Sequence, residues 1–137
     1  AAAGKLRCPV DGATSFTDTF GAPRSGGRRH MGVDMFAAEG TPLVAVTDGV
    51  ILRKQSSPAG GLGVWLRGSN STVYYYAHLS SYASISPGQK IGAGTRVGSV
   101  GSTGNAAGGP PHLHFEVQPG GGSPINPYPT AARACGK

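Results

Sequence analysis

Residues 112–117 read His112-Leu113-His114-Phe115-Glu116-Val117, and polar and apolar side chains alternate through the whole stretch. Successive side chains of a β-strand point to opposite faces, so this alternation predicts a strand with one apolar and one polar face. His112 and His114 are two residues apart and therefore project from the same face. A same-face pair of histidines is an unusual way to build a core, so this strand is also the first candidate for a functional site.

The segments before this strand predict further β-strands. Strands are expected at 43–46, 50–54, 63–67, 72–76, 90–91 and 95–100, separated by turns at 47–49, 68–71 and 86–89, with 63–67 and 72–76 forming a hairpin. No segment shows a sustained helical period. The chain is therefore expected to be mainly β: one antiparallel-sheet domain spanning residues 1–137, with irregular tails at 1–17 and 119–137.

The amino-acid composition and net charge limit the classes of protein to which this chain can belong. The 137 residues include 24 Gly and 11 Pro, and 38% are hydrophobic, which suits a turn-rich folded domain. No apolar run is long enough for a membrane span, and no nucleic-acid-binding module is recognisable. The formal net charge of +6 favours polyanionic partners, which include nucleic acid, anionic lipid and acidic cell-wall polymers. The short run containing Arg24, Arg28 and Arg29 is interpreted as a solvated loop.

Two cysteines lie near the two termini, Cys8 and Cys135. Their positions predict a disulfide that ties the tails together, although two unrelated free thiols are the alternative. A disulfide is natural in an oxidising compartment. The start of the sequence lacks the charged and apolar regions of a secretory signal, which fits either a cytosolic chain or the mature form left after processing. The two cysteines favour the second interpretation, so we expect a secreted or wall-associated protein.

The other histidines extend the candidate site. His30 precedes Asp34 by four residues, and His78 lies at the end of the aromatic strand that begins at Thr72. A catalytic zinc uses three protein ligands, and His30, Asp34 and one of His112 or His114 would supply them. The positive charge of such a site makes hydroxide available at neutral pH. Two histidines then remain for proton transfer and for stabilising an oxyanion.

The motifs around these residues resemble a known family. Residues 30–50, beginning His30-Met31-Gly32-Val33-Asp34, are similar to the lysostaphin/LytM-type zinc metallopeptidases, as are 76–80, 97–104 and 111–117. The resemblance implies a β-rich fold with an open groove, one Zn²⁺ per chain, and hydrolysis of peptidoglycan cross-bridges or stem peptides. It assigns His30, Asp34 and His114 to the metal. His112 is then expected to be the general base and His78 to orient water or stabilise the oxyanion, although these two roles can be exchanged.

Three further expectations follow from the resemblance. Glu116, on the face of His112 and His114, is a candidate hydrogen-bond partner of a ligand. The tyrosine that many members carry shortly before the first motif is absent from residues 24–29. A monomer is expected to act on the peptide part of bacterial peptidoglycan, and the alternative is a catalytically silent module that binds the wall or activates other wall hydrolases.

Overall fold

Eight β-strands dominate the structure, a computed structural model that describes residues 6–137. The strands are β1 (Val33–Phe36), β2 (Pro42–Val44), β3 (Gly49–Ser57), β4 (Gly61–Gly68), β5 (Val73–Tyr82), β6 (Lys90–Ile91), β7 (Arg96–Val100) and β8 (His112–Gln118). They are accompanied by the 3₁₀ helices η1 (Ser25–Gly27), η2 (Gly104–Ala106) and η3 (Pro119–Gly121), and by one α-helix, α1 (Tyr128–Ala134). The prediction of a mainly β domain is confirmed.

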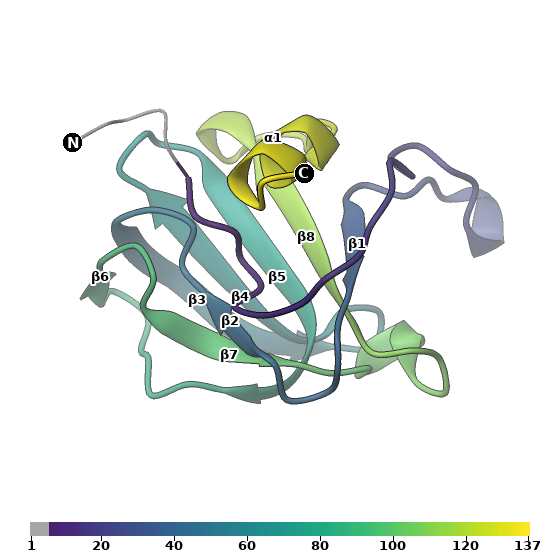
Figure 1. The fold of residues 1–137 in the computed structure, drawn as a ribbon, viewed down its shortest axis with the longest axis horizontal. Helices are drawn as coiled ribbons and strands as arrows, with labels where there is room; N and C mark the ends of the chain where they lie inside the picture. The colour runs from purple at the N-terminus through teal and green to yellow at the C-terminus, as the bar shows by residue number, and fades with distance from the viewer. Residues whose placement is uncertain (1–5) are drawn as a thin grey trace.

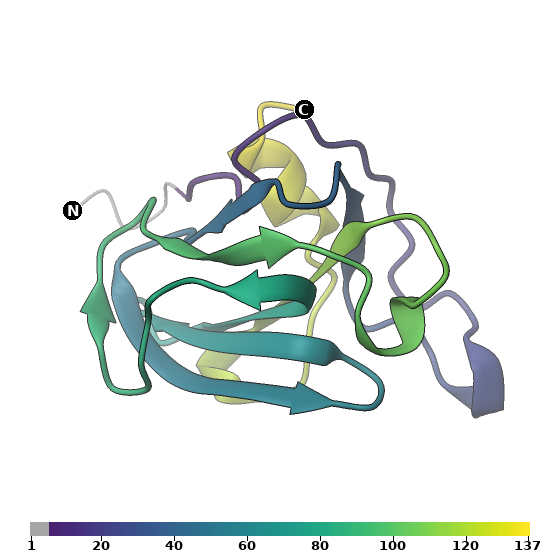
Figure 2. The same cartoon turned by 90° about the horizontal axis from the view of Figure 1, so that it is seen from below.

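The strands form one antiparallel sheet in the order β1-β8-β5-β4-β3-β6, with β7 joining β5 and β2 (Figures 1 and 2). The predicted hairpin is present, because β4 pairs with β5 from Leu66↔Tyr74 to Leu62↔Leu79. The ten residues of β5 serve two different partners. Its first half pairs with β8 as far as Ala77↔His114, and its last residues pair with β7 from Leu79↔Val100 onward. This change of partner falls at His78.

Strand β1 was not predicted from the sequence. It has only four residues, and its polar Asp34 lies between the buried Val33 and Met35. So short a strand gives too few alternations to be detected by pattern. It is held by pairing with β8, which is sixty or more residues away in the chain, in the register Val33↔Phe115 to Phe36↔His112.

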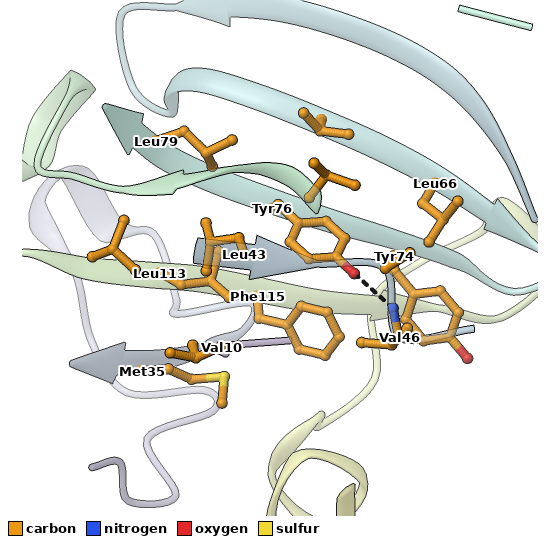
Figure 3. Packing of buried hydrophobic residues seen from close by; sticks show 14 of the residues in the cluster. Val10, Met35, Leu43, Val46, Leu66, Tyr74, Tyr76, Leu79, Leu113 and Phe115 are labelled. Atoms are coloured by element: carbon orange, nitrogen blue, oxygen red, sulfur yellow. Dashed lines mark hydrogen bonds between the residues drawn. The ribbon is translucent and has the colours of Figure 1, made fainter. Parts of the chain in front are cut away.

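The hydrophobic core is tied together by one buried hydroxyl. Tyr76 is fully buried, and its Oη donates to the carbonyl of Val44 at 2.9 Å and accepts from the amide of Val46 at 3.1 Å (Figure 3). These bonds satisfy two backbone groups at the end of β2 that would otherwise be buried without partners. Phe115 packs edge-on against the same ring, with centroids 5.4 Å apart. The core thus connects β2, β5 and β8 directly beneath the histidine-bearing segments.

The C-terminal tail differs from the prediction. Residues 119–137 were expected to be irregular, but Tyr128–Ala134 form α1, which buries Ala131 and Ala132. Seven residues are too few for a helical period to appear in the sequence, and the helix depends on tertiary packing. No helix of the described residues has the length and apolarity to cross a membrane.

The predicted disulfide is present between Cys8 and Cys135. It joins the segment before Val10, which bridges to Leu43, to the end of α1. Residues 1–5 of the predicted N-terminal tail lie outside the described residues.

Candidate metal centre and active site

Pairing between β1 and β8 places Asp34 directly opposite His114. The Oδ1 atom of Asp34 lies 3.3 Å from Nδ1 of His114 and 2.9 Å from Nε2 of His30. The two imidazole nitrogens are 3.2 Å apart. Three donor atoms from separate segments therefore converge on one point.

The dimensions of this triangle fit a tetrahedral zinc ion. Ligands bound at 2.0–2.1 Å in tetrahedral geometry lie about 3.3 Å from one another, close to all three separations. The hydrogen bonds on the far side of each ring also suit a metal. Nδ1 of His30 donates to the carbonyl of Thr19 at 3.2 Å, and Nε2 of His114 donates to Glu116 at 2.7 Å. With a metal bound, the nitrogens that face Asp34 would therefore be lone pairs, the form in which imidazole binds a metal.

Without a cation these three donors share protons. Burial opposes ionisation of Asp34, but its hydrogen bonds with His114 and His30 outweigh burial and hold its pKa well below the usual range. Burial likewise disfavours protonated His114, yet the hydrogen bonds with Asp34 and Glu116 prevail and raise its pKa to about 9. A proton on His114 thus occupies the place that a metal would take, and Glu116 accepts a hydrogen bond from His114, the ligand expected from the sequence.

His112 and His78 lie beside this triangle. Nδ1 of His112 donates to the carbonyl of Pro110 at 3.0 Å, and its Nε2 is 3.7 Å from Oδ1 of Asp34. Nδ1 of His78 donates to the carbonyl of Thr103 at 2.7 Å. The two rings are 5.1 Å apart between centroids. Each ring is fixed by a backbone carbonyl through Nδ1, which leaves Nε2 as an acceptor.

His78 has an unusual backbone. Its φ is +67°, in the left-handed region that side-chain-bearing residues rarely adopt. The residue sits where β5 changes partner, and its amide donates to the carbonyl of Gly60 at 2.8 Å. This twist aims a buried imidazole at the site, and burial lowers its pKa to about 4. Non-glycine residues in such conformations concentrate at functional sites.

Thr103 is a positioning residue that sequence reasoning did not single out. Its carbonyl holds His78, while its Oγ1 donates to the carbonyl of Leu79 at 2.7 Å and accepts from the amide of Leu62 at 3.1 Å. The loop before η2 is thereby fixed to both β4 and β5. The signal was present in the sequence, because Thr103 belongs to the quoted motif at 97–104. Thr19 left no comparable signal, although its Oγ1 and its backbone carbonyl lie 3.1 Å and 3.2 Å from Nδ1 of His30.

The five predicted side chains open into one groove of about 450 Å³. Its lining comes from β1, β5, β8 and η2, from the turn at 59–60, and from the hairpin that carries the arginines. Arg24, Arg28 and Arg29, interpreted from sequence as a solvated loop, are exposed but lie on the wall of this groove. Tyr75 also lines it, and burial together with Glu116 raises its pKa to about 12, so its hydroxyl stays protonated.

Comparisons with known proteins agree with this geometry. Residues 28–127 match Peptidase family M23. The chain is 37% identical over 132 residues to an L-Ala–D-Glu endopeptidase of Bacillus subtilis, and the match covers 88% of this chain but 40% of that protein. The chain therefore spans less than half of this relative.

Solved structures show the same fold. The catalytic domain of the antimicrobial peptidase lysostaphin from Staphylococcus simulans superposes with a TM-score of 0.75 at 30% identity, covering 86% of this chain and 92% of that one. A zinc-containing peptidase from Vibrio cholerae superposes with a TM-score of 0.76 at 28% identity, covering 88% of this chain and 38% of that one. The resemblance inferred from the sequence motifs is confirmed: this chain belongs to Peptidase family M23.

Proposed function

We propose that this chain is a zinc-dependent endopeptidase that hydrolyses peptide bonds of bacterial peptidoglycan. The observation that carries the proposal is the triangle of His30, Asp34 and His114, whose donor atoms have the spacing of a tetrahedral zinc site. Zinc held there would acidify an attacking water and polarise the scissile carbonyl. The remaining two histidines face the same space with their Nε2 lone pairs.

The two remaining histidines suit different tasks. His112 can accept the proton of the attacking water at Nε2 and later return it to the leaving amine, which is the role of a general base and acid. His78 is neutral and also presents an acceptor at Nε2, so it can orient the same water by accepting a second hydrogen bond. Because its Nδ1 proton is engaged by Thr103, His78 can donate to an oxyanion from Nε2 only after it has taken up a proton.

Peptidoglycan as the substrate is supported by the relatives. The Bacillus subtilis protein is named for cleavage of an L-Ala–D-Glu bond, and this chain matches it over 88% of its own length. The net charge of +6 suits anionic wall polymers. An extracytoplasmic, wall-associated location completes the proposal, and the Cys8–Cys135 disulfide supports it. We propose that the protein acts as a monomer.

The test combines zinc analysis with turnover. Wild-type protein should bind one zinc per chain and release new amino groups from purified peptidoglycan, and a chelator should abolish the release. His114→Ala should lose zinc, whereas His112→Ala should keep most of the zinc and lose turnover. Asp34→Asn should weaken zinc binding, and the exposed Asp11→Asn serves as its matched control.

Two results would contradict the proposal. Stoichiometric zinc in His114→Ala would overturn the ligand assignment. A zinc-loaded wild type that releases no amines from peptidoglycan would instead favour the silent wall-binding module.

A further inference from the structure

The arginines beside the metal centre belong to an ordered hairpin. We call residues 21–30 the arginine hairpin. Two backbone hydrogen bonds close it: the amide of Gly21 donates to the carbonyl of His30 at 2.7 Å, and the amide of His30 donates to the carbonyl of Ala22 at 2.8 Å. The amide of Arg24 donates to the carbonyl of Arg28 at 2.8 Å, and the turn between them is η1. The same ladder that positions His30 thus fixes where the arginines stand.

Like charges are brought together in this hairpin. Arg24 lies opposite Arg28, Pro23 bridges to Arg29, and all three arginines are among the residues that line the groove. Cations of the same sign placed across a hairpin repel each other, which costs stability unless an anion lies between or beside them. The arrangement therefore favours a negatively charged group in this part of the groove.

The acidic side chains of the groove are already engaged. Among the described lining residues the carboxylates are Asp34 and Glu116. Oδ1 of Asp34 faces the two metal-ligating histidines, and Oδ2 is 3.5 Å from Arg24, a long contact. Glu116 accepts hydrogen bonds from His114 at 2.7 Å and from Gln118 at 2.9 Å. The three arginines of the lining outnumber these two carboxylates, and a divalent cation at the metal centre would make the groove more positive.

We propose that Arg24, Arg28 and Arg29 form a carboxylate-binding subsite that selects peptides with a free carboxylate near the scissile bond over neutral peptides such as glycine bridges. This inference rests on the proposed peptidase function and names its substrate class. Guanidinium groups pair with carboxylates through two parallel hydrogen bonds, so they supply orientation as well as attraction. The relative named for an L-Ala–D-Glu bond cleaves beside a residue that carries such a carboxylate.

The test uses one peptide in matched versions. Glutamate or glutamine follows the scissile bond, and this pair tests the side-chain carboxylate. The C-terminus is either free or amidated, and this pair tests the terminal carboxylate. A glycine-only peptide is the neutral reference. Wild type should show a kcat/KM about tenfold or more higher for whichever carboxylate the subsite binds, the effect expected for one charge-assisted hydrogen bond. In Arg28→Gln/Arg29→Gln this preference should fall toward one. Arg133→Gln, which removes one positive charge at an exposed position of α1, should keep it.

Several outcomes would overturn the subsite. One is equal kcat/KM for carboxylate and amide peptides in the wild type; another is a preference that survives in the double variant. If the arginine variants lose only activity on walls that carry anionic polymers, the hairpin binds the polymer and the carboxylate subsite is wrong. Arg24→Gln is measured separately with a zinc assay, because Arg24 also contacts Asp34. Failure of the peptidase proposal is distinguishable, since zinc-loaded wild type would then cleave neither peptides nor peptidoglycan.

Discussion

Asp34 and His114 are paired residues of β1 and β8, with 3.3 Å between Oδ1 and Nδ1. Residues directly opposite in an antiparallel sheet have closely spaced side chains, so the backbone ladder itself sets this distance. Glu116 lies two residues after His114 on β8 and accepts a hydrogen bond from Nε2, on the side of the His114 ring away from Asp34. The sheet therefore builds the carboxylate–histidine part of a candidate metal site from two adjacent strands.

The first prediction concerns that outer carboxylate. Glu116→Gln keeps the side-chain shape but removes the charge that strengthens His114 as a ligand. We expect zinc affinity to fall by about tenfold or more, as is typical when a partner of a ligating histidine is lost. Competition with a chromophoric chelator measures the affinity. The exposed Glu39→Gln is the control, and an unchanged affinity in Glu116→Gln would contradict the role.

The second prediction uses the left-handed backbone of His78. His78→Gly and His78→Ala should both lose most turnover, but the glycine variant should be more stable by about 1 kcal/mol because it relieves the strain at φ +67°. Thermal unfolding compares the two. Ser71 has the same φ in an exposed turn, so Ser71→Gly and Ser71→Ala should show the same ranking with full activity. Equal stability of the two His78 variants would rule out the strain.

The third prediction concerns the buried hydroxyl of Tyr76. Tyr76→Phe leaves the carbonyl of Val44 and the amide of Val46 without their partner, which should lower the free energy of unfolding by about 1–3 kcal/mol. Denaturant unfolding measures the change. Tyr128→Phe, which keeps its ring contact with Phe16, should shift stability by less than about 0.5 kcal/mol. A neutral Tyr76→Phe would show that these bonds contribute nothing net.

The fourth prediction is a pH dependence of the zinc-free protein. The folded-state pKa of His114 is raised to about 9 from an ordinary value of 6.5, so the folded protein holds a proton that the unfolded chain releases between these values. This contribution is fully present below pH 6.5 and is lost as the pH rises through 9. The Tm of zinc-free protein should therefore fall across this window. With zinc bound the proton is displaced, so the fall should disappear; the same fall with zinc bound would contradict the assignment.

The fifth prediction concerns the disulfide, which closes a loop over a sequence separation of 127 residues. Reduction should lower stability by about 2–4 kcal/mol, chiefly because the unfolded chain gains freedom. Thermal unfolding with and without reductant measures the effect. The double variant Cys8→Ser/Cys135→Ser should match the reduced protein and be insensitive to reductant. A wild-type Tm that reductant leaves unchanged would show that the bond adds no stability.

Sequence patterns predicted most of this fold because runs of β-forming residues are bounded by turn residues. The hairpin of β4 and β5 follows from two such runs, and β8 also alternates polar and apolar side chains. Strand β1 and helix α1 did not follow, because segments of four and seven residues are stabilised by distant partners rather than by their own pattern. The motifs also selected five side chains that the structure places along one groove.

The sequence by itself determined that His112 and His114 share a face, because the side-chain period of a strand is a local property. It also determined the residue types that zinc can use. Only the tertiary structure decided that Asp34 faces His114, that His78 turns inward at a change of strand partner, and that the arginine hairpin borders the groove. These relations depend on the register between strands far apart in the chain, and register is set by burial of the whole sheet rather than by any one segment.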